Sequence, residues 1–204
     1  TSTPAAGYQF VNWTQGGSSV STNSSYTFTL GGNRTLVANF TLISYTVSTS
    51  SSPSGGGTTN GGGTYTYNDG VTVTATPAGG YNFVNWTQGG SSVSTSASYT
   101  FTVTSSRTLV ANFSQIIYTV SISSSPAAGG SASGGGTYGS GSSATVTATP
   151  ATGYLFVNWT QGGSSVSTSA SYTFTVTTNR TLIANFTQAS YTITTSSNPV
   201  AGGT

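Results

Sequence analysis

The sequence repeats itself with a period of 73 residues, and the copies are nearly identical. The string FVNWTQGGSSVST occurs three times and places Trp13, Trp86 and Trp159 at equivalent positions. A repeat of this size is one structural unit, and the stability of an array is about the sum of unit and neighbour-interface terms. Arrays of small units provide length, stiffness or multivalency. The repetition therefore predicts a structural role.

The repeats can be divided at the equivalent tyrosine of each copy. Two complete units then occupy residues 45–117 and 118–190, whereas residues 1–44 match the later part of a unit and residues 191–204 match its first part. This phase predicts either a window on a longer covalent array or subunits whose end fragments complete one another.

The composition removes most catalytic chemistry. The chain has no His or Cys, its three basic residues are all Arg, and Asp69 is its only acidic residue. It therefore lacks an imidazole, a thiolate, an ammonium group and a second carboxylate for proton transfer or nucleophilic attack. One carboxylate cannot hold a metal ion by itself. We expect no enzyme activity, no catalytic or cofactor-binding residues, no metal and no cofactor.

The few charges also limit the partners. The arginines lie 73 residues apart and form no linear cluster, so the sequence does not predict nucleic-acid binding. It has no apolar run of 18 residues, and we expect no membrane insertion. With 2% charged residues, the surface gives its strand edges little of the protection that charge usually provides. The composition predicts self-association or shielding by glycans.

Asn-x-Ser/Thr sequons are the candidate sites for such glycans. The alternative is chance, because a chain rich in Ser and Thr produces sequons without selection. The candidate N-glycosylation sites are Asn12, Asn23, Asn33, Asn39, Asn85, Asn112, Asn158, Asn179 and Asn185. Asn112 should point away from the core, because it alternates with apolar neighbours.

Alternating apolar and polar residues predict half-buried strands at 71–76, 99–104, 109–113 and 118–123. None of these segments has the period of a helix, and Thr, Val, Tyr and Phe dominate them. We expect an all-β module of five or six short strands, built as a small β-sandwich. The spacing of 99–104 and 109–113 predicts a hairpin.

Two glycine-rich segments, 55–63 and 129–141, differ between the copies while their flanks do not. Glycine clusters are typical of turns and loops. These segments are predicted to be exposed loops that tolerate truncation.

The equivalent tryptophans are predicted to anchor the core of each repeat. Alternation slips between Phe83 and Trp86, and a β-bulge would bring both rings to the same side. Trp13, Trp86 and Trp159 lie beside Phe and Tyr in strand patterns, which favours burial. The alternative is an exposed platform on which a sugar ring stacks.

Two further features have alternative interpretations. Arg107 begins a strand, either as a solvated strand end or as a cation stacked on a Tyr or Trp ring. Rows of Thr at 72–76 and 100–104 either form an ordinary exposed strand face, suited to O-linked sugar, or bind ice. Ice binding needs a flat array, and twist between strands favours the first interpretation.

The segments GYNFVNWTQGG, SYTFTVTSSRTLVANF and YTVSTSSSP resemble the divergent internalin B-type repeat, and the resemblance covers the whole repeat unit. It implies a small β-rich module, distantly β-grasp-like, that serves as a stalk or spacer in secreted and surface proteins. It implies no catalytic residues. The near absence of charge departs from many members of this family and favours self-association or glycan shielding.

Together these patterns predict an extracellular or cell-surface structural repeat protein, whose end-to-end β modules form a stalk, rod or filament. The alternative is an adhesin segment that binds glycans or host and cell surfaces. If the chains assemble head to tail, the strand at Tyr191 should lie along the strand that contains Leu36 and Phe40, or along its equivalent in a neighbouring copy.

Overall fold

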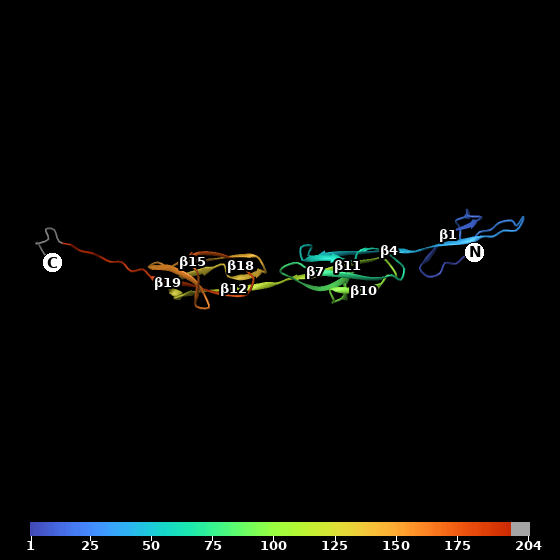
Figure 1. Cartoon of the computed structure of the whole chain (residues 1–204). Coiled ribbons are helices and arrows are strands. Elements are labelled where there is room, and N and C mark those ends of the chain that lie inside the picture. The colour runs from blue at the N-terminus through green and yellow to red at the C-terminus, as the bar shows by residue number, and fades with distance from the viewer. Residues whose placement is uncertain (197–204) are drawn as a thin grey trace. The chain divides into compact units, whose positions relative to one another are not determined.

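The computed structural model describes residues 1–196 and confirms the all-β fold (Figure 1). The chain forms two compact units, Thr1–Gln115 and Ile116–Thr204. The first unit contains residues 1–44 and the repeat of residues 45–117 except its last two residues, and the second contains the repeat of residues 118–190.

The repeat of residues 45–117 is a two-layered module. One layer is a five-stranded sheet in the order β6-β4-β11-β8-β9, and the other is a three-stranded sheet in the order β10-β7-β5. Its strands are β4 (Ser44–Ser52), β5 (Gly57–Asn60), β6 (Gly63–Thr66), β7 (Gly70–Pro77), β8 (Tyr81–Gln88), β9 (Ser91–Ser94), β10 (Ser98–Thr102) and β11 (Arg107–Gln115).

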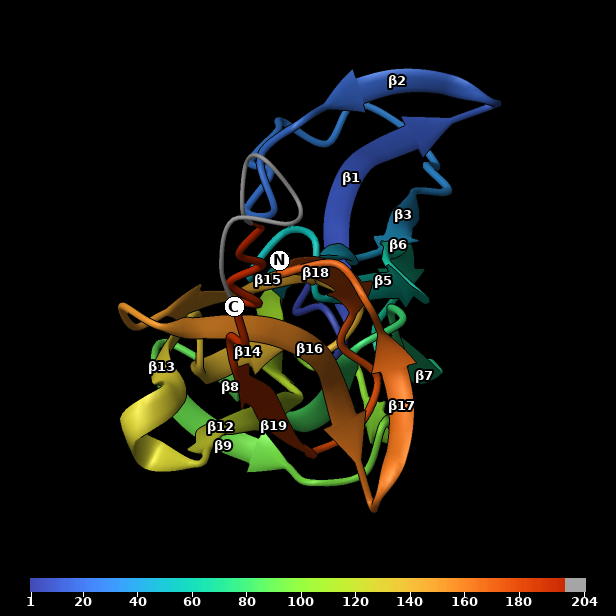
Figure 2. The ribbon, with the colours of Figure 1, turned by 90° about the vertical axis from the view of Figure 1, so that its left-hand side faces the viewer.

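The repeat of residues 118–190 has the same architecture. Its sheets have the orders β14-β12-β19-β16-β17 and β13-β15-β18, and Figure 2 shows β16 and β17 as a curved hairpin. Its elements are β12 (Ile117–Ser125), the short 3-10 helix η1 (Ala127–Gly129), β13 (Gly130–Ser133), β14 (Gly136–Gly139), β15 (Ser143–Pro150), β16 (Tyr154–Gln161), β17 (Ser164–Ser167), β18 (Ser171–Thr175) and β19 (Arg180–Gln188).

Residues 1–44 contain the counterparts of β8, β9 and β11, three strands of the larger sheet. β1 (Tyr8–Gln15), β2 (Ser18–Ser21) and β3 (Val37–Leu42) form a sheet in the order β2-β1-β3. The turn between β1 and β2 is made by Gly16 and Gly17 with φ of 59° and 83°. Such positive angles at both central residues fit the twist of a two-residue hairpin and favour glycine. The turn recurs in both complete modules.

The core of each complete module lies between its two sheets. In β7, Val71, Val73 and Ala75 are buried while the threonines between them are exposed, as the alternation predicts. The larger sheet contributes its apolar side chains to the same core. The buried residues of the first core are Val47, Val71, Val73, Ala75, Trp86, Val103, Leu109, Ala111 and Phe113; those of the second are Val120, Ala144, Val146, Ala148, Trp159, Val176, Leu182, Ala184 and Phe186.

The predicted bulge is present in β8. The register against β11 shifts at Val84, because Phe83 lies opposite Phe113 and Asn85 lies opposite Asn112. Val84 is exposed, whereas the Phe83 ring packs against the core at 6.1 Å from the Trp86 ring. The extra residue therefore brings both rings to the same side, as expected for a β-bulge.

The prediction of exposed loops at 55–63 and 129–141 is wrong. These segments contain the strands β5, β13 and β14, and the strand β6 begins at Gly63. Glycine is needed where the ring of Phe113 or Phe186 covers the backbone: a Cβ on Gly57 would lie 2.6 Å from Phe113, and one on Gly130 would lie 2.7 Å from Phe186. With these strands and β9, each complete module has more strands than the five or six expected.

The predicted hairpin of residues 99–104 and 109–113 is also wrong. β10 pairs with β7 in one sheet, and β11 pairs with β4 and β8 in the other. The connection crosses the core at Val103. Its carbonyl accepts a hydrogen bond from the Asn68 N–H, and its N–H donates to the Asp69 carbonyl. The chain changes sheet here because Val103 contributes a buried side chain to the space between them.

Residues 191–196 lie outside any sheet, and the side chains of Tyr191 and Ile193 are 87% and 88% exposed. The predicted pairing of this segment with the strand of Leu36 and Phe40 is not present in the described part of the chain. The equivalent residue of Ile193 in β12, Val120, is buried against the rest of its module. The remainder of the predicted first-strand fragment, residues 197–204, lies outside the described residues.

Candidate functional site

Residues 1–196 contain no group of three or more His, Cys, Asp or Glu side chains that could hold a metal ion. The single carboxylate, Asp69, closes a turn: its Oδ2 accepts hydrogen bonds from the Thr66 backbone N–H at 2.6 Å and from the Thr66 hydroxyl at 3.0 Å. In the other complete module Ser142 takes this place and donates its hydroxyl hydrogen to the Gly139 carbonyl. Asp69 therefore has a local structural role.

The tryptophans differ in burial. Trp86 and Trp159 are fully buried, and each indole N–H donates to a backbone carbonyl at 3.2 Å, that of Ala97 or Ala170. A buried Trp with a satisfied N–H is an anchor of the core and offers no face to a sugar. Trp13 is half-buried, and its N–H donates to the Ser24 carbonyl at 3.3 Å.

The strand-end arginine of each module stacks on aromatic rings. The guanidinium carbon of Arg107 lies 4.2 Å from the ring centroid of Phe101 and 5.5 Å from that of Tyr99. Its Nε donates to Gln88 at 2.7 Å and its Nη1 donates to the Tyr99 hydroxyl at 3.2 Å. Arg180 has the same arrangement. The solvated-end interpretation is therefore wrong, and the stacking one is correct, although the rings are Phe and Tyr.

Substitution of Arg180 by Lys is expected to reduce the free energy of unfolding by about 0.5–2 kcal/mol, because Lys keeps the charge and loses the planar stacking and the fork of donors. Urea unfolding of the whole chain measures the change. Arg34→Lys is the comparison, since Arg34 is exposed and also lies over a ring, 5.0 Å from the Phe28 centroid. An equal cost for the two substitutions would show that the closer approach of Arg180 to Phe174 and its hydrogen bonds to Gln161 and Tyr172 contribute nothing.

Pairs of sequon asparagines face one another across neighbouring strands, in an arrangement that we call the asparagine ladder. Asn112 Nδ2 donates to Asn85 Oδ1 at 2.9 Å and to Thr87 Oγ1 at 3.1 Å. Asn85 Nδ2 in turn donates to Ser92 Oγ at 3.1 Å. The ladder consists of Asn12, Asn39 and Thr14 in the first repeat, Asn85, Asn112 and Thr87 in the second, and Asn158, Asn185 and Thr160 in the third.

The ladder divides the nine candidate glycosylation sites into two groups. An amide nitrogen carries two hydrogens, and those of Asn112 have acceptors in the ladder, although the side chain points away from the core as predicted. The six ladder asparagines are half-buried. The other three, Asn23, Asn33 and Asn179, are exposed and lie outside the strands. Of the nine candidate sites, these three have an exposed side chain whose amide nitrogen a bulky sugar can reach.

Removal of a ladder asparagine should destabilise its module. Asn185→Ala deletes the donor to Asn158 and Thr160, and we expect a loss of about 0.5–1.5 kcal/mol for each bond in the free energy of unfolding. Denaturant titration checks this value. Asn33→Ala, at an exposed sequon, should change stability little; if both substitutions have the same small effect, the ladder is not stabilising.

In each complete module the outer surface of the three-stranded sheet is lined by hydroxyl groups, and we call it the hydroxyl face. Its centre is a pair of threonine hydroxyls from neighbouring strands, Thr72 and Thr100 at 2.7 Å, or Thr145 and Thr173 at 2.8 Å. The exposed side chains of this face in the first complete module are Thr58, Asn60, Thr72, Thr74, Thr76, Ser98, Thr100 and Thr102. None of them is ionisable.

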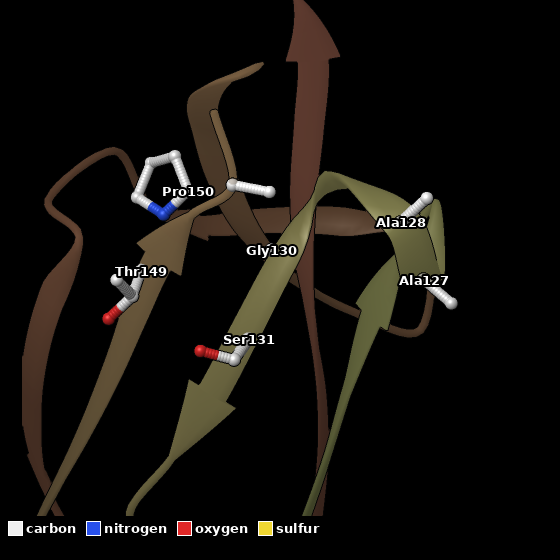
Figure 3. A pocket seen from close by; sticks show the side chains of 7 residues that line it. Ala127, Ala128, Gly130, Ser131, Thr149 and Pro150 are labelled. Carbon is white, nitrogen blue, oxygen red and sulfur yellow. The ribbon is translucent and has the colours of Figure 1, made fainter. Parts of the chain in front are cut away.

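A shallow open notch lies beside η1 in the other complete module. Figure 3 shows the Pro150 ring on one side of it and Ala127 and Ala128 on the other. Methyl groups, the proline ring and the hydroxyls of Ser131 and Thr149 line the notch. None of the side chains that line it is ionisable.

Successive repeats are joined by a single residue. Only Ile43 separates β3 from β4, and only Ile116 separates β11 from β12. Ile43 donates its N–H to the Gly7 carbonyl at 2.7 Å and accepts at its own carbonyl from the Tyr67 N–H at 3.0 Å. The last strand of one repeat therefore leads directly into the first strand of the next.

These features define a tandem array of small β modules in which the stacked arginine and the asparagine ladder recur from copy to copy. The sequence profile of the divergent InlB B-repeat domain matches residues 1–44, 45–117 and 118–190, so the chain belongs to the divergent InlB B-repeat family. No curated protein and no solved structure matches the chain significantly. Within residues 1–196, no helix has the length and apolar character needed to cross a bilayer.

Proposed function

We propose that this chain is part of an extracellular, cell-surface structural protein, in which the tandem modules act as a stalk or spacer. The observation that carries the proposal is the one-residue joint: each complete module has its own core, and the chain passes from the last strand of one repeat to the first strand of the next through Ile43 or Ile116. The family is typical of surface proteins. We propose no enzymatic role, as the lack of His and Cys and the single acidic side chain led us to expect.

Surface labelling tests this location. Antibodies against the 204-residue chain should bind intact, unpermeabilised cells of the source organism, and brief protease treatment of the cells should remove the signal. A cytoplasmic marker provides the control for cell integrity. Labelling that requires permeabilisation would contradict the proposal.

Glycans are proposed on the exposed sequons of this surface. Asn23, Asn33 and Asn179 are the acceptors, and the ladder asparagines remain unmodified. Peptide mass spectrometry of natively sourced protein should find the added mass on these three residues. Unmodified peptides at all three would contradict glycan shielding. Sugar on Asn112 or Asn185 would contradict the proposal that the asparagine ladder prevents glycosylation of its members.

Self-association is proposed at the edge of β3. In the complete modules the counterparts of β3 pair with a parallel first strand, whereas in the described residues β3 pairs only with β1. Val37, Phe40 and Leu42 are 53%, 40% and 41% exposed. A first strand of the β4 type, from another copy or from the same longer array, would cover this edge by strand addition.

A synthetic peptide of residues 44–52 tests the strand addition. It should bind the 204-residue chain and protect the amide hydrogens of β3 from exchange. A scrambled peptide of the same composition is the control. Protection that does not differ between the two peptides would contradict the proposal.

Binding of uncharged glycans is a second candidate function, and the hydroxyl face favours it. The face is exposed, free of charge and present in both complete modules. Binding on a glycan array should be lost when the central threonines of both faces, Thr72, Thr100, Thr145 and Thr173, are all replaced by Val, with the fold unchanged. Binding that survives the four substitutions would remove this surface as the site.

A further inference from the structure

The first and last strands of each complete module lie side by side in the middle of the larger sheet. β4 pairs with β11 in parallel, from Val47 opposite Arg107 to Ser52 opposite Asn112. β12 pairs with β19 in the same way, from Val120 opposite Arg180. The module is therefore closed by direct hydrogen bonding between the two strands through which the chain enters and leaves it.

The parallel direction determines how tension acts on this pair. The chain enters the module at Ser44, at the beginning of β4, and leaves it at Gln115, at the end of β11. In a parallel pair these two points lie at opposite ends of the ladder, so a pull between them slides one strand along the other. The hydrogen bonds are then loaded together, whereas a pull on two adjacent strand ends opens them one at a time.

We propose that the parallel pair of first and last strands is a mechanical clamp that keeps each module folded when the array is under tension. The proposal deepens the spacer function and rests on it, because a surface stalk must transmit force along its chain. The one-residue joints deliver the force directly to the clamp strands.

The structure supports both ends and one face of the clamp. At its first end, the Thr46 N–H donates to Ser106 Oγ at 3.1 Å, and in the other module the Thr119 N–H donates to Asn179 Oδ1 at 2.9 Å. At its far end, Asn112 belongs to the asparagine ladder, which ties β11 to β8. On the core face Val47 and Leu109 are buried, so sliding the strands would also expose apolar surface.

The direction of pulling provides the test. The chain contains no Cys, so two engineered cysteines give unique attachment points on the whole 204-residue protein. Ser44→Cys with Gln115→Cys loads the clamp in shear, and Ser44→Cys with Ser105→Cys opens it from one end. All three residues are exposed. In single-molecule pulling, the length released, at roughly 3.3–3.6 Å per residue between the attachment points, identifies the module that opened.

We expect the rupture force in shear to be at least about twice that of the opening geometry, because the bonds of the ladder share the load only in shear. Urea unfolding checks that both variants fold. Ile117→Cys with either Gln188→Cys or Thr178→Cys repeats the comparison on the second complete module. Equal forces in the two geometries, or a weaker shear rupture, would overturn the clamp. That result would leave surface labelling unchanged, whereas an intracellular location would remove the spacer function without altering the forces.

Discussion

Replacement of Trp86 by alanine is expected to lower the free energy of unfolding of the module of residues 45–117 by about 3–5 kcal/mol. The ring is fully buried between the two sheets, and its removal leaves a cavity lined by the remaining core residues. A folded domain has only about 5–15 kcal/mol of stability in total, so this module should unfold at a much lower temperature. Calorimetry of the whole chain measures the shift.

Two further substitutions serve as a parallel test and as a control. Trp159→Ala should have the same effect on the other complete module, where the ring has the same burial and the same type of backbone partner. Val84→Ala, on the exposed bulge of β8, should change the melting temperature little. A Trp86→Ala protein that melts within a degree of the original would show that the indole does not stabilise the core.

Deletion of residues 129–136 is expected to unfold the module of residues 118–190, with a loss of more than about 4 kcal/mol. The deletion removes β13, which pairs with β15, and the glycines that the Phe186 ring covers. A loop of this length could be shortened at little cost in closure entropy, so the experiment distinguishes a strand from a loop. Calorimetry should show only the transition of the other module.

Point substitutions provide a milder version of the same test. Gly57→Ala would place a methyl group 2.5 Å from the Thr76 carbonyl and 2.6 Å from Phe113, whereas a methyl group on Gly70 meets no atom within 4 Å. Gly57→Ala should therefore destabilise and Gly70→Ala should not. If the deletion and Gly57→Ala both leave two transitions at their original temperatures, the glycine-rich segment is dispensable.

The strands that could be predicted from the sequence are those with one face toward the core and the other toward solvent. In β7 and β12 apolar and hydroxyl residues alternate because one face meets the core and the other meets solvent, and this alternation is visible in a single sequence. β5 and β13 gave no such signal, since their core-facing positions include Gly57 and Gly130, where a neighbouring phenylalanine fills the space that a side chain would need.

The alternation of apolar and polar residues did not indicate to which of the two sheets a strand belongs. β10 and β11 both have period two, but the residue that sends the chain from one sheet to the other is Val103, which resembles any other buried valine in the sequence. The structural sites were partly predictable. Stacking of Arg107 was one of two interpretations, whereas the asparagine ladder depends on the register of β8 against β11 and could not be derived before that register was known.

The one-residue joint has a consequence for folding fidelity. Near-identical neighbours in one polypeptide invite exchange of equivalent strands, a common failure of repeat proteins. If β4 paired with β19 in place of β11, the strand left for β11 would be β12, which follows it after Ile116 alone. A parallel pair needs a crossover of a dozen or more residues, so one residue cannot connect it. The shortness of the connection thus excludes the exchanged pairing of neighbouring copies, and an array of almost the same sequence can still fold each copy with its own strands.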